Sequence, residues 1–271
     1  MEKELFSFSR LDTFNNCPRS YYYTYILHQR GGDNIYSFLG TAVHEAVEQM
    51  DNGKISAEQG LDMFLEAVDD ADMLGLPWIS DNVARKYIDC VSHYFYNYKK
   101  PEVKEIHTEE HFIIDVGKIS IQGYIDKWYE KNGAIYIEDY KTSSKFTAKH
   151  LIDKQRQLSI YGRALEDKFP EKPIFLGFNM LKYALINGKL VERNTLDTIG
   201  DYQDGMVNIP YTPELKQDLE AYVADTIAGI EKLDKNIPYK WDMAFNPEKE
   251  FFCCNLCSHQ KKCLNQADEW K

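Results

Sequence analysis

The sequence contains no long hydrophobic run, no internal repeat and no low-complexity segment. No apolar stretch approaches the roughly 20 residues of a membrane-spanning helix, so we expect neither a membrane span nor a membrane partner. The opening residues MEKELFSFSR are charged and lack the apolar core of a secretion signal, which predicts a soluble protein in a reducing, cytoplasmic compartment. No Gly-x-x-x-x-Gly-Lys-Ser/Thr phosphate loop occurs, so any ATP-driven unwinding has to come from a partner.

Positive charge is scarce as well. The 32 Lys and Arg residues are outnumbered by 43 Asp and Glu residues, which gives a net charge of −11. Such a chain is not expected to coat nucleic acid nonspecifically. Carboxylates that hold divalent metal ions contribute to the same negative net charge. An enzyme that binds nucleic acid locally is therefore compatible with this net charge. The six cysteines, in a reducing compartment, indicate thiols or metal ligands rather than disulfides.

The 271 residues are 44% hydrophobic and 14% aromatic, which is enough for one large domain or two small ones. Periodicity and capping signals predict helices first and strands later. The expected helices cover 9–28, 38–52, a segment opening at Ser56 and a segment from Ser80 to Lys100. Strands are expected at 103–115, 118–130 and 134–142, then a helix at 147–168, strands at 174–183 and 190–196, and a helix from Thr212. This order predicts an α/β or α+β fold with a mixed sheet and a crossover helix.

The helical stretch FLGTAVHEAVEQ places three small or polar residues on one face. Gly40, His44 and Glu48 stand at i, i+4 and i+8, so their side chains stack along the helix. A solvated face with a single histidine is an equally good interpretation of this helix alone.

The strand AIYIEDYKT is more informative. Because side chains alternate along a strand, Ile135, Ile137, Asp139 and Lys141 share one face. A carboxylate and an amine at the end of an apolar face are costly unless they meet a partner or a metal ion. The preceding strand, IQGYIDKW, brings Asp126 to the neighbouring end, where both aspartates could bind one magnesium or manganese ion. A solvated edge strand is the alternative.

The next helix carries Gln157 and Tyr161 one turn apart, together with a basic stripe. The stripe is interrupted by Asp153 and consists of Lys145, Lys149, Arg156 and Arg163. A phosphate backbone could lie on it, although solvated charge is the ordinary interpretation. Tyr22, within the run SYYYTY, is a candidate for stacking on an unpaired base, with a place in the core as the alternative.

The stretch FFCCNLCSHQKKC holds four of the six cysteines. Cys254, Cys257 and Cys263 have the spacing of a soft-metal site, which needs a fourth ligand. Spacing leaves the choice open between Cys253, Cys90, Cys17 and a histidine. Cys90, within an apolar helix, is better explained as a buried small hydrophobic residue.

These motifs together resemble a known family. His44, Asp126, Asp139-x-Lys141 and Gln157-x-x-x-Tyr161 stand in the order found in RecB-like nucleases of the PD-(D/E)xK superfamily. More narrowly, SRLDTFNNCPRSYYY and CNLCSHQKKC are similar to the first and last motifs of its iron–sulfur branch. That branch includes AddB-type exonuclease domains and the stand-alone nucleases of CRISPR adaptation. The resemblance runs from residue 7 to residue 264, and 54–100 and 184–212 carry no recognised motif.

The resemblance implies a restriction-endonuclease-like fold, with a mixed central sheet flanked by helices in one domain (1–271) that has a helical insertion at 54–100. It implies a magnesium or manganese ion held by His44, Asp126, Asp139 and the backbone carbonyl of Tyr140. Lys141 would be the catalytic lysine, Gln157 and Tyr161 would support the site, and Glu48 matches an acidic helix position of many relatives. Two departures concern substrate contacts rather than metal ligands: Lys127 replaces a frequent arginine, and Thr142-Ser143-Ser144 replaces Thr-Gly.

The resemblance also names Cys17 as the fourth cysteine ligand. A 4Fe–4S cluster on Cys17, Cys254, Cys257 and Cys263 would join residues 1–28 to residues 245–271 as a structural staple. Zinc is the alternative metal, and Cys253 or His259 is an alternative ligand.

The expected function is metal-dependent hydrolysis of DNA phosphodiester bonds. We expect an exonuclease or end-processing enzyme that acts on DNA with single-stranded character, in recombination, repair or CRISPR adaptation of a bacterium, archaeon or phage. A helicase or other recombination or CRISPR proteins are the expected partners. The alternatives are a catalytically idle DNA-binding or assembly subunit and a metal-dependent RNase.

Overall fold

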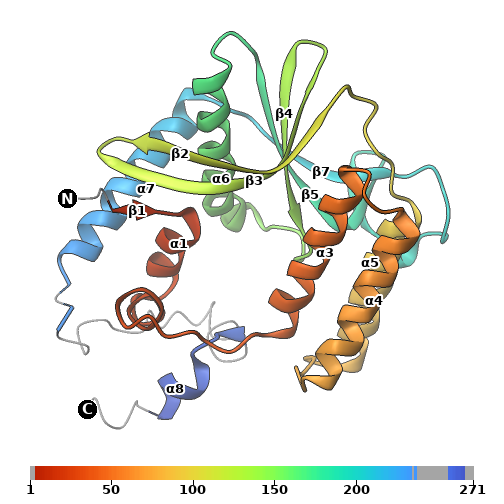
Figure 1. Cartoon of the computed structure of the whole chain (residues 1–271), viewed down its shortest axis with the longest axis horizontal. Coiled ribbons are helices and arrows are strands. Elements are labelled where there is room, and N and C mark those ends of the chain that lie inside the picture. The colour runs from red at the N-terminus through yellow and green to blue at the C-terminus, as the bar shows by residue number, and fades with distance from the viewer. Residues whose placement is uncertain (1–3, 234, 237–255, 266–271) are drawn as a thin grey trace. The chain divides into compact units, whose positions relative to one another are not determined.

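The computed structural model describes residues 4–233, 235–236 and 256–265 (Figure 1). The chain divides into two compact units, and each is described by itself. The first unit comprises Met1–Asn34, Ile113–Gly123 and Gln217–Lys271, and the second comprises Ile35–Phe112 and Tyr124–Lys216. That residues 1–271 fold as a single domain stays a prediction.

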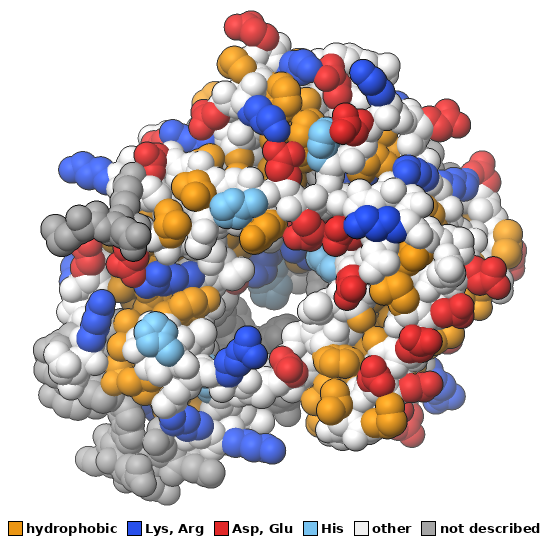
Figure 2. Space-filling view, in the orientation of Figure 1, with side chains coloured by type: hydrophobic (Ala, Val, Ile, Leu, Met, Phe, Trp, Pro, Cys, Tyr) orange, Lys and Arg blue, Asp and Glu red, His pale blue; other side chains and the backbone are white. Residues whose placement is uncertain are grey.

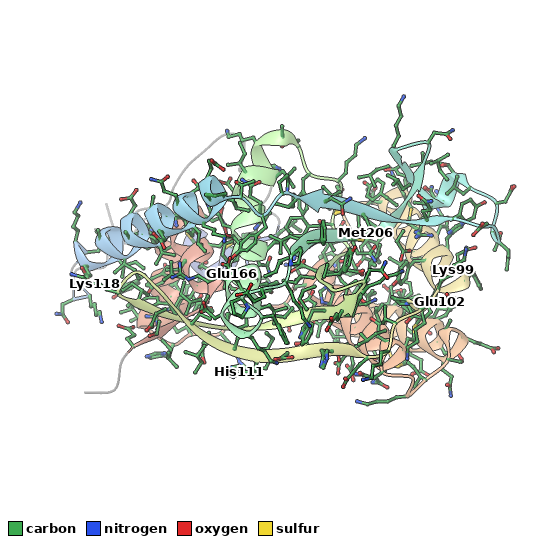
Figure 3. The ribbon with its side chains drawn as sticks, turned by 90° about the horizontal axis from the view of Figure 1, so that it is seen from above. Lys99, Glu102, His111, Lys118, Glu166 and Met206 are labelled. Carbon is green, nitrogen blue, oxygen red and sulfur yellow. The ribbon has the colours of Figure 1, made fainter. Side chains whose placement is uncertain are left out.

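A mixed sheet of seven strands forms the framework. Its strands are β1 (Leu5–Phe6), β2 (Ile106–Val116), β3 (Ile119–Lys131), β4 (Ala134–Lys141), β5 (Ile174–Ile186), β6 (Lys189–Glu192) and β7 (Gln203–Ile209). Strand β4 pairs with β3 in antiparallel and with β5 in parallel orientation, and β7 pairs antiparallel with β5. In the second unit β2 and β7 form opposite edges, which His111 and Met206 mark in Figure 3.

Two of the tight turns in the sheet fall at Asn-Gly pairs. Asn132 and Gly133 connect β3 to β4 with φ values of 53° and 76°. Asn187 and Gly188 repeat this conformation between β5 and β6, at 49° and 74°. Left-handed backbone at both central residues matches the twist of a two-residue hairpin, and Asn-Gly tolerates it best.

Four helices belong to the second unit: α3 (Ile35–Asp51), α4 (Ala57–Met73), α5 (Asp81–Tyr96) and α6 (Ala148–Lys168). Helix α4 follows Ser56 as predicted and begins with a capping box, because Ser56 and Gln59 exchange side-chain hydrogen bonds with each other's backbone N–H. Helices α3, α4 and α5 pack around an apolar cluster that includes Phe64 and Phe95 and extends to Tyr140 of β4. Acidic side chains gather over the exposed face of α4 (Figure 2).

Beneath this helical layer, a buried ionic network joins α3 to the sheet. The carboxylate of Asp51 is 1% exposed and accepts hydrogen bonds from Lys127 Nζ at 3.2 Å, from Tyr98 Oη at 2.6 Å and from Tyr140 Oη. Lys127 Nζ also lies 3.6 Å from the Glu138 carboxylate. Each buried charge therefore meets an opposite charge, which a low-dielectric interior requires.

The first unit begins with α1 (Phe8–Asn16), α2 (Pro18–Tyr21) and a π-helical turn (Tyr22–Ile26). The predicted continuous helix at 9–28 is therefore wrong, because Cys17 is extended at φ −160° and Pro18 opens a new helix. Ser7 caps α1, two residues before the predicted start of the helix at residue 9. The unit also holds α8 (Gln260–Asn265) and most of α7 (Pro213–Glu231), which starts at the predicted Thr212-Pro213.

Strand β7 is absent from the sequence prediction. Gly205 stands in its middle, and a Cβ atom there would lie 2.7 Å from the Tyr183 carbonyl oxygen and 2.8 Å from that of Met180. The glycine thus permits the close approach of β7 to β5, although it weakens the strand signal of QDGMVNI. The mixed α/β fold with a central sheet flanked by helices is confirmed. No helix in the described ranges is long and apolar enough to cross a membrane.

The Asp51 network leads to a stability prediction. Asp51→Asn removes the main counter-charge of buried Lys127, so we expect the free energy of unfolding to fall by about 3 kcal/mol, at the lower end for a broken buried pair because Glu138 stays nearby. Urea unfolding followed by circular dichroism measures this loss. Asp62→Asn, on the exposed face of α4, serves as the control and should change the value by less than about 0.5 kcal/mol.

A double variant tests whether the loss comes from the unpaired charge. Adding Lys127→Met to Asp51→Asn removes the stranded ammonium, so the double variant should unfold less easily than Asp51→Asn alone. If the two substitutions lower the free energy of unfolding by amounts that simply add, the loss does not come from the unpaired Lys127 charge.

Candidate active site

Two carboxylates define the candidate site in the second unit: Asp139 of β4, which is buried, and Asp126 of β3, whose side chain is 13% exposed. They lie next to the antiparallel pair Lys127–Glu138, because Asp126 precedes Lys127 on β3 and Asp139 follows Glu138 on β4. This position brings the two side chains close together across the strands. Asp139 is 0% exposed, and within the described part of the chain its Oδ1 atom has no hydrogen-bond partner. The backbone N–H of Tyr140 donates to Asp126 Oδ2 at 3.0 Å.

The closeness of the two carboxylates has an electrostatic consequence. Burial and the negative charge of Asp139 raise the pKa of the Asp126 carboxyl well above its usual range. The charge of Lys141 and the N–H of Tyr140 offset this only in part. A further positive charge at this point would therefore stabilise the ionised pair.

Helix α3 brings His44 to the same carboxylate. Its Nδ1 atom lies 3.5 Å from Asp126 Oδ2, and it forms a hydrogen bond with the Tyr140 backbone. Burial lowers the pKa of His44, and the opposing effect of Asp139 is smaller. The imidazole is thus neutral at physiological pH, the form that binds metal ions.

Lys141 links the carboxylates to α6. Its ammonium pairs with Asp139 Oδ2 and donates to Gln157 Oε1 at 3.3 Å. Gln157 Nε2 in turn donates to Tyr161 Oη at 2.8 Å. Burial and the charges of Asp139 and Asp126 raise the pKa of Tyr161 well above its usual range, so the phenol keeps its proton. The turn spacing of QLSIY thus aligns two polar groups behind the lysine.

Two glutamates border the site. Glu48 follows His44 by one helical turn and accepts a hydrogen bond from Asn52 at 3.4 Å. Glu109 of β2, which no sequence motif marks, is exposed and has a left-handed φ of 49°. Its partial burial toward the site, with the charges of Glu48 and Asp139, raises its pKa. Nothing in the string TEEH distinguishes Glu109 from its neighbours, since its position depends on this local departure from strand geometry.

The donor set fits a hard divalent cation. It offers two carboxylates, one neutral imidazole and the backbone of Tyr140, and oxygen with a single nitrogen suits magnesium or manganese. The orphaned Oδ1 of Asp139 is a buried acceptor that a cation would satisfy. No group of three or more His, Cys, Asp or Glu side chains is already arranged around a metal position among the residues described.

The other predicted contact residues lie on or just before α6, apart from Tyr22 in the first unit. Helix α6 carries Lys149, Arg156 and Arg163 at the predicted seven-residue spacing, and Lys145 is exposed before its first turn. Arg156 forms an ion pair with Asp153 at 3.1 Å. Tyr22 is 4% exposed, so its ring has no accessible face for an unpaired base.

Lys127 has a different place from the one expected. From the sequence, its difference from the frequent arginine is expected to affect substrate contacts. The side chain is 3% exposed and belongs to the Asp51 network, so it is part of the interior.

Three of the four predicted cluster cysteines are described, all in the first unit. Cys17 separates α1 from α2, and Arg19 Nη1 lies 4.0 Å from Cys263 Sγ. Burial raises the pKa of Tyr23, and negative charge on Cys263 or Cys17 would raise it further, which places both thiols near one ring. Cys17, Cys257 and Cys263 form no disulfide, and Cys254 lies outside the described residues, as does Cys253. His259 is buried and bonds to Thr24 at 2.9 Å.

Comparison with known proteins agrees with this geometry. A family model described as the PD-(D/E)XK nuclease superfamily matches residues 5–264. Among solved structures, the chain is similar to one reported as "Crystal structure of SSO0001", with 15% identity, a TM-score of 0.34, and coverage of 84% of this chain and 77% of that chain. No curated protein matches the sequence.

The raised pKa of Asp126 predicts a gain in stability on its neutralisation. Its folded pKa exceeds the unfolded value of about 3.9, so ionising it destabilises the metal-free fold as pH rises through the folded pKa. Asp126→Asn should therefore raise the melting temperature in EDTA at pH 7, and the gain should shrink toward pH 4. Asp153→Asn, an exposed position on α6, is the control. A melting temperature that falls at pH 7 would contradict the electrostatic account.

Proposed function

The chain belongs to the PD-(D/E)XK nuclease superfamily, and from this premise we propose that it is a metal-dependent nuclease that hydrolyses DNA phosphodiester bonds. The observation that carries the proposal is the buried carboxylate of Asp139, which has an unsatisfied oxygen beside Asp126 and an ammonium, that of Lys141, on its other oxygen. Such an arrangement is costly for folding and is typical of a site built for catalysis.

We assign the metal ligands to His44, Asp126, Asp139 and the backbone carbonyl of Tyr140. When bound, magnesium or manganese would lower the pKa of a water molecule and offset the charge that develops on the phosphate. The neutral state of His44 and the crowding of the two aspartates support this assignment. Glu48 and the newly identified Glu109 border the same position and extend its negative field.

The remaining residues act on the phosphate and its water. Lys141 holds positive charge at the site, where it can stabilise charge on the phosphate oxygens or orient the attacking water. Gln157 fixes the direction of the ammonium by accepting one of its hydrogens. Tyr161 keeps its own proton and holds the Gln157 amide in place. The chain from β4 to α6 thus preorganises the lysine.

The substrate is proposed to be DNA with single-stranded character, attacked from an end. Lys145, Lys149, Arg156 and Arg163 supply positive charge along α6, on which a phosphate backbone can lie. The acidic face of α4 repels phosphate and directs DNA away from itself (Figure 2). We place the protein in the RecB-like iron–sulfur branch, in recombination, repair or CRISPR adaptation, with a helicase or related proteins as partners.

We further propose a 4Fe–4S cluster on Cys17, Cys254, Cys257 and Cys263. Support comes from Arg19, two residues after Cys17, whose Nη1 lies 4.0 Å from Cys263 Sγ, and from the effect that charge on Cys263 or Cys17 has on the pKa of Tyr23. Four thiolates also suit zinc, which metal analysis separates from iron. The proposed role is to tie the N-terminal helices to the C-terminal segment, without a part in the chemistry.

Removing the catalytic charges tests the nuclease proposal. Asp139→Asn and Lys141→Ala should each lower the rate of DNA cleavage about 100-fold or more, the usual cost of one preorganised electrostatic group. Cleavage of labelled single- and double-stranded DNA with manganese or magnesium gives the rate, EDTA should abolish it, and RNA run in parallel identifies an RNase. Lys189→Ala, an exposed lysine on β6, is the matched control. Unchanged rates in both site variants would overturn the mechanism and favour an idle binding subunit.

Cysteine substitution tests the cluster separately. Cys17→Ala should lose the brown colour, lower bound iron and sulfide, and reduce the solubility of the protein. Cys90→Ala provides the control, because Cys90 is buried in α5 and donates to Asn194 at 3.4 Å. Full iron content and stability in Cys17→Ala would refute the ligand assignment, and zinc without iron in the wild type would replace the cluster by a zinc site.

A further inference from the structure

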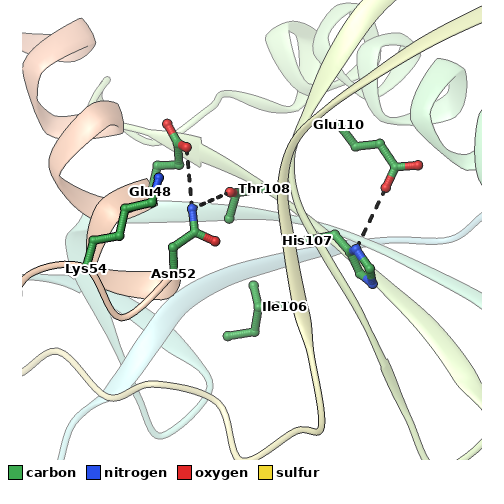
Figure 4. Close-up of a pocket in the computed structure, with 7 residues that line it drawn as sticks. All are labelled: Glu48, Asn52, Lys54, Ile106, His107, Thr108 and Glu110. Carbon is green, nitrogen blue, oxygen red and sulfur yellow. Dashed lines mark hydrogen bonds and ion pairs between the residues drawn. The ribbon is translucent and has the colours of Figure 1, made fainter.

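The end of helix α4 carries negative charge that the candidate active site does not explain. Trp78, which follows this helix, packs edge-on against Tyr36 in the first turn of α3, with 5.7 Å between the ring centroids. His44 lies eight residues further along α3, roughly 12 Å at 1.5 Å per residue. The pocket of about 540 Å³ that Glu48 lines is farther still along α3 (Figure 4). Charge at the end of α4 is therefore separated from the proposed metal position by more than the screening length of about 8–10 Å.

This charge is unfavourable for the helix itself. Asp69, Asp70 and Asp72 stand within the last five residues of α4, and no basic residue stands in its last turn. The carbonyl groups at the C-terminus of a helix already carry partial negative charge, so acidic side chains there destabilise the helix. All three side chains are exposed, and within the described part of the chain none of them forms an ion pair. A cation supplied by another molecule would remove this cost.

Apolar side chains share the same helix end. Met73 and Leu74 are 78% and 65% exposed, and Leu65 of α4 and Ile79 of the following loop are 39% and 47% exposed. Figure 2 shows apolar side chains intermixed with acidic ones at the lower end of α4 as it is oriented in Figure 1. We call this surface, formed by these four residues and the three aspartates, the α4 tip. Exposed apolar side chains that are gathered in this way mark an interaction surface.

The turn after α4 holds the α4 tip in a fixed shape. Gly75 has a left-handed φ of 67°, and the N–H of Leu76 donates to the Ala71 carbonyl oxygen at 3.0 Å. These are the features of a Schellman motif, which ends the helix and redirects the chain. Leu76 and Trp78 then pack against the apolar cluster of α3, α4 and α5. A surface that is already ordered loses little conformational entropy when a partner binds.

We propose that the α4 tip binds a segment of a partner protein in which apolar side chains are interleaved with Lys or Arg. The apolar side chains of the segment cover Met73 and Leu74, and its cations meet Asp69, Asp72 and the carbonyl end of α4. The same carboxylates repel a phosphate backbone and an anionic lipid surface. They also repel the α4 tip of a second copy. The inference does not depend on the proposed nuclease function.

A peptide selection tests the chemistry that the α4 tip binds. Random dodecapeptides displayed on phage are selected on the immobilised wild type and counter-selected on Met73→Ser/Leu74→Ser. The remaining peptides should combine apolar residues with Lys or Arg. One of them, synthesised with a fluorescein label and titrated by anisotropy, should bind the double variant about tenfold or more weakly than the wild type, as for removal of a central contact. Ile199→Ser, which is 72% exposed outside the α4 tip, is the control and should bind as the wild type.

Neutralising the carboxylates gives the second measurement. Asp69→Asn/Asp72→Asn should weaken binding of the peptide about threefold or more, the range for two exposed charges. The same double variant should raise the melting temperature of the free protein by about 2 °C, because the helix end loses unfavourable charge. Glu102→Gln/Glu171→Gln, at exposed positions elsewhere, should change neither quantity. Opposite effects on affinity and stability would support the inference, since an ordinary solvated face produces no such opposition.

Three results would overturn the inference. The first is a selection that leaves no peptide with a preference for the wild type, or only peptides without Lys and Arg. The second is peptide binding that Asp69→Asn/Asp72→Asn leaves unchanged. The third is a dimer, seen by light scattering, that Met73→Ser/Leu74→Ser dissociates, because the occupant would then be a second copy. DNA cleavage by Met73→Ser/Leu74→Ser should equal that of the wild type, so failure of this inference and failure of the proposed nuclease function are distinguishable.

Discussion

The carboxylate of Asp51 is the constraint on which the second unit depends. It is buried at the end of α3 and bonds to groups from the segment after α5, from β3 and from β4. Lys127 and Tyr140, its partners on the strands, directly follow Asp126 and Asp139 in the sequence. Because side chains alternate across the sheet, the network holds one face while the candidate ligands occupy the other. The same contact therefore fixes the helix that carries His44 against the strands that carry the aspartates.

Charge balance explains the rest of the site. Asp126 and Asp139 repel one another in a buried position, and Lys141 compensates only part of their charge. The fold tolerates this because the Asp51 carboxylate accepts hydrogen bonds from three groups and the apolar cluster around α3 to α5 is large. Stability and proposed activity thus make opposite demands on neighbouring residues of the same two strands.

Local patterns predicted much of this arrangement, and tertiary contacts decided the remainder. Alternation in AIYIEDYKT and the Asn-Gly turn were sufficient to bring Asp126 and Asp139 together, since a hairpin is a local structure. Pro18 indicates a break in the helix, but helical periodicity on both sides of it led to the prediction of one continuous helix. Strand β7 and Glu109 could not be predicted, because one depends on pairing with β5 and the other on a left-handed residue. The burial of Asp51 could not be predicted either, because Asp51 stands at the polar end of an amphipathic helix.

The two-residue turn at Asn132-Gly133 has a consequence for the order of assembly. Asp126 and Asp139 are 13 residues apart and meet through one short hairpin, a structure that forms in about 1–10 μs. His44 arrives only when α3 docks from a distant part of the sequence, and this closes a much longer loop. We therefore expect the carboxylates to be paired early in folding, before their histidine is present. A nascent chain would then pass through a stage that already concentrates negative charge and attracts cations, while it lacks the groups that would let it act on a phosphate.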